Sequence, residues 1–130
     1  MDELPIQSGD DVVRVRQFVR NAAADNGLSL VDQTKLVTAA SELARNTLVH
    51  GRGGAARVEV VKSANGRVGI KLYFTDEGPG IPDIELALTD GWTSGGGMGL
   101  GLSGSKRLVH DFAIRSVVGE GTCVTITRWA

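Results

Sequence analysis

The chain is poor in the residues that mark several classes of protein. It has one cysteine among 130 residues, so no internal disulfide can form, which fits a reducing cytosol. No apolar run approaches the ~18 residues of a membrane span, and the acidic amino terminus is unlike a signal peptide. The 15 acidic and 14 basic residues are well mixed and leave a net charge of −1. Nothing therefore indicates binding to nucleic acid or to a membrane, and we expect a cytoplasmic protein.

Length and composition are ordinary for a small globular protein. A chain of 130 residues predicts one domain over residues 1–130, large enough to bury a real core. The hydrophobic content of 42% is typical of such domains. Cys123 lies in an apolar strand-like segment, so we expect a buried small side chain there.

Periodicity and turn signals predict an α/β (α+β) two-layer sandwich, in which helices cover one face of a mixed, mostly antiparallel sheet. Pro5 indicates an edge strand, Ser29 begins the second long helix, and Asn65-Gly66 is typical of a hairpin turn. Val58 and Val60 should both point inward. The expected strands are 4–8, 57–62, 68–74, 112–118 and 123–129, and the expected helices are 10–26, 29–49, a short one after 83, and 103–110. The helical residues expected in the core are Leu36, Ala40, Leu43 and Thr47.

Glu42 and Asn46 lie four residues apart on the second predicted helix, at the border of its apolar face. Taken alone, this pair is more typical of a solvated helix edge. In a nucleotide site, however, the Asn46 carbonyl oxygen and triphosphate oxygens could hold Mg²⁺, which prefers hard oxygen ligands. Glu42, one turn earlier, could then accept a proton from an attacking hydroxyl or water.

Asp76 comes directly after an apolar strand and begins the segment Asp76-Glu77-Gly78-Pro79-Gly80. Such a sequence is turn chemistry in its own right, and alone it indicates no more than a strand-to-loop turn. A carboxylate at a strand end can also accept from an exocyclic amine. Gly78 and Gly80 would then allow a flat ring to lie against bare backbone.

Glycine is concentrated in one stretch, because nine of the 18 glycines fall between Gly78 and Gly104. The segment 99–104 fits the G-x-G-x-x-G dinucleotide fingerprint, but no strand precedes it and no acidic residue ends a following strand. A Walker loop is absent too, since no Gly-Lys-Ser/Thr occurs. The run is better interpreted as a flexible lid hinge leading into a helix whose first amides meet phosphates.

Three motifs together resemble the N, G1 and G2 boxes of the GHKL ATPase superfamily, in order and spacing. They are Glu42-x-x-x-Asn46, Asp76-x-Gly78-x-Gly80 and Gly97-x-Gly99-x-Gly101. The resemblance covers nearly the whole chain and implies the Bergerat α/β fold with ATP and Mg²⁺ as cofactors.

At 130 residues the chain is most similar to the stand-alone anti-sigma and switch-kinase branch. The sequence around its boxes looks most like the RsbT-type switch kinases. This implies a serine/threonine kinase that phosphorylates STAS-domain substrates or scaffolds of a stressosome-type stress response and can then bind a phosphatase. An anti-sigma factor kinase and an ATP-gated binding module without turnover stay open as alternatives.

The resemblance also implies a role for each matched position. Asn46 would hold Mg²⁺ and Glu42 would be the catalytic base. Asp76 would bind the adenine amine, with Gly78 and Gly80 at the ring and Thr122 assisting. Lys106 and Arg107 could reach a phosphate or form a solvated basic pair, and Trp92 could contact a partner or pack the lid. The backbone amides that would cradle phosphates belong to Met98, Gly99, Leu100 and Gly101.

Overall fold

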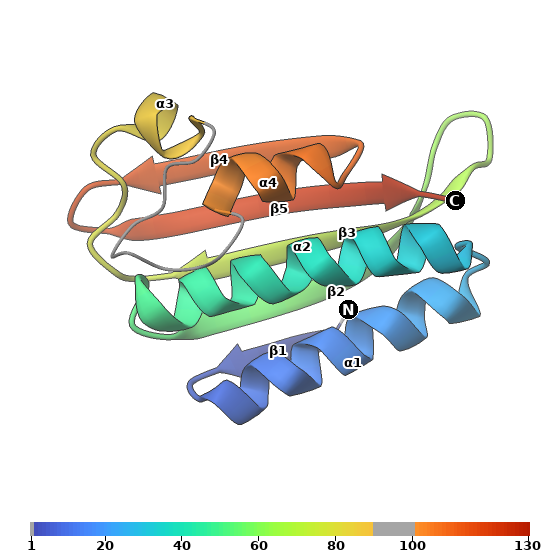
Figure 1. The fold of residues 1–130 in the computed structure, drawn as a ribbon, viewed down its shortest axis with the longest axis horizontal. Helices are drawn as coiled ribbons and strands as arrows, with labels where there is room; N and C mark the ends of the chain where they lie inside the picture. Colours follow the sequence, from blue (N-terminus) through green and yellow to red (C-terminus); the bar gives the residue numbers. More distant parts are fainter. Residues whose placement is uncertain (1, 90–100) are drawn as a thin grey trace.

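The computed structural model describes residues 2–89 and 101–130, which form one five-stranded sheet with helices on one of its faces (Figure 1). The strands are β1 (Asp2–Ile6), β2 (Gly54–Lys62), β3 (Val68–Asp76), β4 (Asp111–Val117) and β5 (Gly121–Trp129). The helices are α1 (Gly9–Asp25), α2 (Leu30–Val49), α3 (Ile84–Ala87) and α4 (Gly101–Arg107). Strand order is β1-β2-β3-β5-β4, and every neighbouring pair is antiparallel. This architecture confirms the predicted α/β sandwich.

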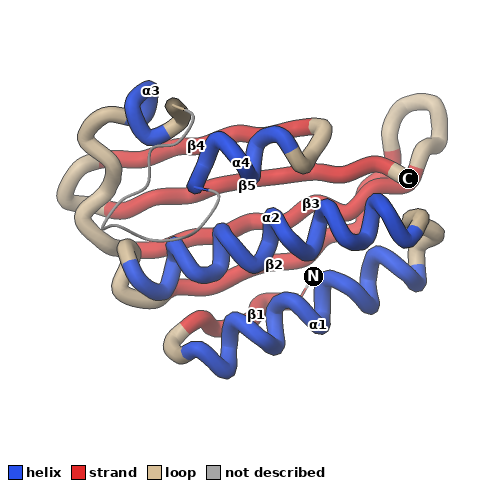
Figure 2. Tube along the Cα trace, in the orientation of Figure 1, coloured by secondary structure: helices blue, strands red, loops and turns tan. Residues whose placement is uncertain are grey.

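Local sequence explains where the two long helices begin. The side chain of Ser8 accepts from the Asp11 N–H at the start of α1, and Ser29 accepts from the Asp32 N–H at the start of α2. Such caps satisfy amides that have no partner within the helix. Figure 2 shows α1, α2 and α4 on the same side of the sheet. None of the helices in the described part of the chain is long and apolar enough to cross a bilayer.

The sheet edges and turns follow the sequence closely. Pro5 lies in β1, which is an edge strand as expected. The β2–β3 hairpin closes through the Ser63 N–H and the Arg67 carbonyl, and Gly66 takes a positive φ of 83° in its loop. Few residues other than glycine accept that backbone conformation readily.

The core lies between the sheet and the helices. All four helical residues expected there are at most 3% exposed. The three apolar ones form one cluster with Ile70, Leu72 and Phe74 of β3. Burial of this apolar surface is the main source of the fold's stability.

Two burial predictions were wrong. Val60 is 51% exposed although its neighbour Val58 is buried. The register of β1 with β2 ends at Val58, so no described strand lies beside Val60 on that side. Cys123 is half-buried because it lies on the opposite face of β5 from buried Val124, the face that the described helices leave uncovered.

Some element boundaries also differ from those expected. β2 begins at Gly54, three residues early, because β1 supplies pairing partners for Gly54, Ala55 and Ala56. The last helix spans Gly101–Arg107 rather than 103–110. Its end comes early because the chain enters β4 at Asp111.

Candidate functional site

A row of paired residues crosses the sheet where β3 ends. Asp76 is paired with Gly54 on one side and Thr122 on the other, and Thr122 is in turn paired with Ser116. Side chains alternate along a strand, so Asp76 projects from the same face as buried Phe74, the face covered by the helices. The sheet therefore brings Asp76 and Thr122 together, although the sequence separates them by more than forty positions.

Asp76 lies against the loop that follows α2. Its Oδ1 accepts from the Gly78 N–H at 2.9 Å. A Cβ added to Gly51 would lie 2.4 Å from the Asp76 Cγ, so only glycine fits at that position. The Gly51 N–H itself donates to the Asn46 carbonyl at 3.1 Å. Gly51 thus connects the helix that carries Asn46 to the strand that carries Asp76.

Gly78 and Gly80 have reasons within the protein for being glycine. A Cβ on Gly78 would lie 2.8 Å from the Gly51 Cα. Gly80 has a φ of 79°, and a Cβ there would lie 2.5 Å from the Val117 carbonyl oxygen. The turn is therefore packed against the loop after α2 and the end of β4, and its contact with a ring stays a prediction.

Thr122 belongs to a small hydroxyl network at the end of β5. Its Oγ1 lies 2.7 Å from the Ser116 Oγ, which also accepts from the Ile81 N–H at 2.7 Å and lies 3.2 Å from the Gly121 carbonyl. Sequence reasoning missed Ser116. The pattern that could have indicated it is Phe112-x-Ile114-x-Ser116, in which a serine follows two apolar residues on the same face of the strand.

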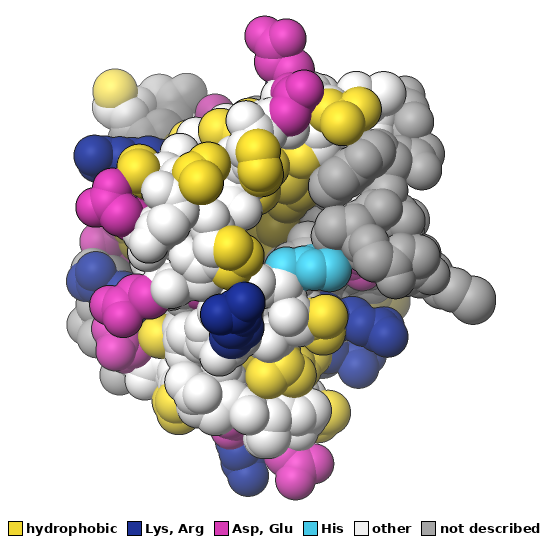
Figure 3. All heavy atoms as spheres, turned by 90° about the vertical axis from the view of Figure 1, so that its left-hand side faces the viewer, with side chains coloured by type: hydrophobic (Ala, Val, Ile, Leu, Met, Phe, Trp, Pro, Cys, Tyr) yellow, Lys and Arg dark blue, Asp and Glu magenta, His cyan; other side chains and the backbone are white. Residues whose placement is uncertain are grey.

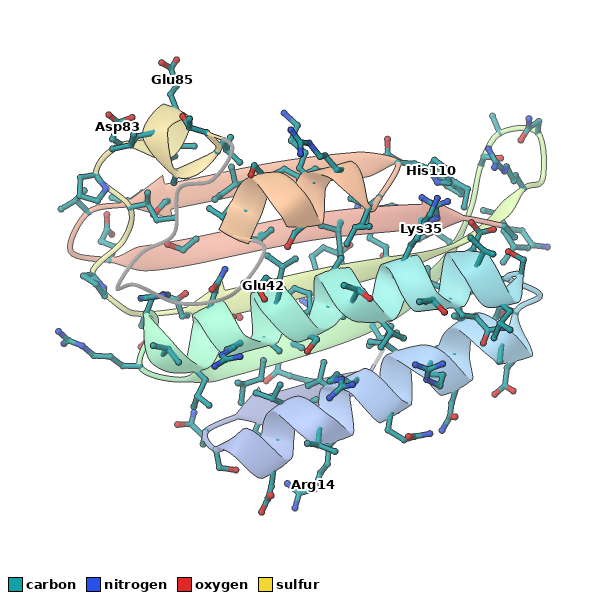
Figure 4. The ribbon with its side chains drawn as sticks, in the orientation of Figure 1. Arg14, Lys35, Glu42, Asp83, Glu85 and His110 are labelled. Carbon is teal, nitrogen blue, oxygen red and sulfur yellow. The ribbon has the colours of Figure 1, made fainter. Side chains whose placement is uncertain are left out.

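Glu42 lies half-buried on α2, on the side that faces α4 (Figure 4). Its Oε1 accepts from the Gly101 N–H at 3.2 Å, at the start of α4. Asn46 lies one turn further along the same stripe and is also half-buried. Glu42 of the predicted N box and Gly101, the last predicted G2 glycine, are therefore neighbours in space.

Other expected residues stand apart or lie outside the described ranges. Lys106 and Arg107 occupy the last turn of α4 and are exposed. The predicted phosphate amides of Met98, Gly99 and Leu100, the lid and Trp92 lie outside the described residues. Within residues 2–89 and 101–130, no group of three His, Cys, Asp or Glu side chains is placed to hold a metal ion.

Figure 3 shows the end of the molecule that carries this site, where hydrophobic side chains are scattered among charged ones. A cavity of about 780 Å³ at this end is lined by Asp76 and Thr122, and by Ala55, Thr75, Arg115 and Cys123. Neither Glu42 nor Asn46 lines it. Its lining includes residues of the uncovered face of the sheet, and this cavity does not connect Glu42 and Asn46 with Asp76.

The charged groups with shifted pKa values lie elsewhere. Hydrogen bonds from the Arg128 guanidinium, 2.6 Å away at its Nη2, lower the pKa of Asp32. The Gln7 N–H, with Arg14 nearby, lowers the pKa of Asp11. These interactions fasten the ends of helices to the sheet or to a neighbouring loop, so they are structural.

The family described as histidine kinase-, DNA gyrase B- and HSP90-like ATPase matches residues 31–129. The serine/threonine-protein kinase RsbT of Bacillus subtilis (strain 168) is 44% identical over 119 residues, covering 92% of this chain and 89% of that protein. The anti-sigma F factor of Thermoanaerobacter sp. (strain X514) is 26% identical over 117 residues, covering 88% and 82% of the two chains.

Solved structures agree on the fold. The RsbU and RsbW domains of Rv1364c from Mycobacterium tuberculosis align over 99% of this chain and 32% of that one, with a TM-score of 0.61 and 22% identity. The mycobacterial sensor histidine kinase MprB aligns over 98% and 97%, with a TM-score of 0.53 and 22% identity. The matched family spans the helix with Glu42 and Asn46 and the strand end with Asp76 and Thr122, so the chain belongs to the histidine kinase-, DNA gyrase B- and HSP90-like ATPase family, in the group of the RsbT serine/threonine-protein kinases.

Proposed function

We propose that this protein is an ATP- and Mg²⁺-dependent serine/threonine kinase of the RsbT type. It phosphorylates STAS-domain regulators in a stress-response pathway of the stressosome kind, and it exchanges partners as they become phosphorylated. The observation that carries the proposal is the hydrogen bond between the Gly101 N–H and Glu42 Oε1. It supports the proposal because Glu42, which we propose as the base, lies beside an amide that we propose to bind phosphate.

The adenine end of the proposed site lies at the strand-end row. Asp76 Oδ1 accepts from the Gly78 N–H, and Oδ2, which has no hydrogen bond to the described residues, would accept from an exocyclic amine. The missing Cβ of Gly51 allows the loop after α2 to pack directly against this carboxylate. The hydroxyl of Thr122, on the neighbouring strand, is held in place by Ser116 and supports the same polar edge.

The phosphate end of the proposed site lies between α2 and α4. The Gly101 amide already receives an anionic oxygen, that of Glu42, so a phosphate oxygen fits the same donor. Asn46, one turn beyond Glu42, would offer its side-chain oxygen to Mg²⁺. The metal would neutralise charge on the phosphates, which is most of what phosphoryl transfer requires.

Glu42 is proposed to take the proton of the substrate hydroxyl. In the structure its Oε1 accepts from the Gly101 N–H, and a phosphate oxygen that took over this donor would free the carboxylate to accept the hydroxyl proton. A general base must lie within hydrogen-bond reach of the proton that it removes.

Two alternatives are weighed against this proposal. The 26% identity to an anti-sigma F factor favours a kinase that also binds a sigma factor. An ATP-gated binding module would need the nucleotide site but no base, so the presence of Glu42 favours the enzyme. We place its action in the cytoplasm, on the evidence of its single cysteine, and we count a phosphatase among its proposed partners.

The experiment is transfer of γ-phosphate from labelled ATP to purified STAS-domain proteins, with Mg²⁺ and with EDTA, followed by mass spectrometry of the labelled residue. We expect label on a serine or threonine of the partner, only with Mg²⁺. Asn46→Ala should weaken Mg²⁺-dependent ATP binding together with transfer. If ATP binds but no STAS protein is labelled, the kinase proposal is wrong and the binding module is favoured.

A further inference from the structure

In the described residues the sheet ends at two edge strands, β1 and β4, and the two edges are unequal. β1 has five residues, among them Pro5 and exposed Glu3. Proline and charge on a short strand are the usual means of preventing edge-to-edge pairing. β4 has seven residues and no proline, and its backbone has no positive φ. Only β4 is suited to accept another strand.

One end of the β4 edge is already covered by the turn after β3. The Gly119 N–H donates to the Pro79 carbonyl at 2.9 Å, and the Ile81 N–H donates to Ser116 Oγ at 2.7 Å. The Cα of Gly80 is so close to Val117 that a Cβ would collide with the Val117 carbonyl. Among residues 2–89 and 101–130, none is shown to pair with the edge at segment 111–115, whose centre is Ala113.

The uncovered segment is complementary to itself. In an antiparallel pair centred on Ala113, Asp111 of one copy lies opposite Arg115 of the other, and two-fold symmetry makes this ion pair twice. Phe112 lies opposite Ile114 in the same register, again twice. Opposite charges and apolar pairs directly across from one another both stabilise strand pairing. We propose that β4 pairs with β4 of a second copy of this chain, joining two sheets into one of ten antiparallel strands.

Side-chain placement supports this register. Asp111 Oδ2 accepts from Trp129 Nε1 at 2.9 Å, which orients the carboxylate and leaves Oδ1 to accept from a guanidinium. Arg115 is exposed and has no hydrogen bond or ion pair within the described part of the chain. Both project to the uncovered face of the sheet, whereas Phe112 and Ile114 project to the helix face, where each is half-buried. The charged pairs and the apolar pairs thus fall on opposite faces.

A five-residue edge gives a small interface, so the dimer is weak and depends on concentration. Pairing at 111–115 leaves Asp76, Thr122 and the α2 stripe uncovered, because these lie at the end of the sheet or on the helix layer. The inference therefore does not depend on the proposed kinase function.

The first experiment is sedimentation velocity of the full chain over a wide concentration range, without nucleotide. We expect a reversible monomer–dimer equilibrium. Arg115→Asp places acid opposite Asp111 at both pairs and should weaken association at least about tenfold. The double change Asp111→Arg with Arg115→Asp restores opposite charges and should recover most of the association. Arg16→Asp makes the same charge change on exposed α1 and should leave association unchanged.

The second experiment tests the register directly. In a Cys123→Ser background, Ala113→Cys should be joined to its counterpart by a short thiol–thiol crosslinker, because the two-fold axis passes between these residues. Val117→Cys is the matched control, and in this register it lies far from its counterpart. The proposal is overturned if the wild type stays monomeric at every concentration. This holds also if the β4 edge of that monomer binds a strand of another protein. A folded Arg115→Asp variant that associates as the wild type does also overturns the proposal, as does crosslinking that is equal at 113 and 117.

Discussion

The Gly101 N–H donates a hydrogen bond to Glu42 Oε1 at 3.2 Å, although 59 positions separate the two residues. The bond joins the middle of α2 to the first residue of α4. The structural and the chemical role of this carboxylate can therefore be separated by replacing it with glutamine. Glutamine keeps an oxygen that accepts from the Gly101 N–H but has no oxygen that can act as a base.

Glu42→Gln should therefore keep the fold and ATP binding while lowering phosphoryl transfer about 10²–10⁴-fold, the usual contribution of a general base. Transfer rate, ATP affinity by calorimetry and thermal unfolding are the three measurements. Glu3→Gln, on the exposed edge strand, is the matched control and should change none of them. A glutamine variant that transfers phosphate at the wild-type rate would show that Glu42 is not the base.

Asp76→Asn should weaken ATP binding by about tenfold or more, which corresponds to about 1.4 kcal/mol. The amide oxygen can still accept from the Gly78 N–H, so the turn should survive. The NH₂ group, however, is a donor facing the amine that the carboxylate would accept from. Calorimetry measures the affinity and circular dichroism checks the fold. Unchanged affinity in a folded variant would remove Asp76 from the adenine site.

Thr122→Val should weaken ATP binding more than Ser116→Ala does. Both changes break the 2.7 Å contact between the two hydroxyl groups, but only the first removes the hydroxyl assigned to the nucleotide. The comparison of the two ATP affinities therefore separates direct binding of the nucleotide by Thr122 from a purely structural role of this hydroxyl pair. Equal losses in the two variants would mean that Thr122 acts only by holding the ends of β4 and β5 together.

Gly51→Ala should destabilise the protein by about 1–3 kcal/mol, the usual cost of forcing extra atoms into a packed site. The new Cβ would meet the Asp76 side chain at 2.4–2.6 Å, so ATP affinity should fall as well. Gly9→Ala is the matched control, because a Cβ there meets nothing within 4 Å. Urea unfolding of both variants measures the difference, and equal free energies of unfolding would contradict the close packing described here.

His110 should make stability depend on pH near neutrality. Partial burial of its ring, with Arg128 and Arg67 nearby, lowers the pKa of His110 below the usual 6.5. The unfolded chain then binds this proton more readily than the folded protein does. The free energy of unfolding should therefore decrease as pH falls from above 6.5 through the folded pKa.

The structure gives this pH dependence a physical cause. The backbone N–H of Trp129 donates to His110 Nδ1 at 2.9 Å, and protonation of Nδ1 would remove this acceptor. His110→Gln keeps an acceptor that does not titrate. The difference in unfolding free energy between wild type and variant, measured by urea at pH 8, 7, 6 and 5, should change with pH. A difference that is constant across this range would contradict the assignment.

Local pattern was sufficient for much of the fold and for the candidate residues. Helical spacing placed Glu42 and Asn46 on one stripe beside the apolar face, and the apolar strand before Asp76 placed this carboxylate at a strand end. Ser29 indicated where α2 begins, because a polar side chain before an amphipathic run satisfies the first amides. The cap at Ser8, a residue expected in a strand, became evident only in the structure. The roles of these residues in binding and catalysis stay predictions.

The sequence by itself thus determined the elements, the faces of the long helix and the motifs, since each depends on residues close together in the chain. Only the tertiary structure decided which of them meet. Strand order placed β5 between β3 and β4, so that Asp76 lies beside Thr122 and Thr122 beside Ser116. The short reach of β1 exposed Val60, and the uncovered face of the sheet left Cys123 half-buried. These outcomes depend on long-range pairing and on the limited area that the helices cover, and no local pattern of hydrophobicity contains either.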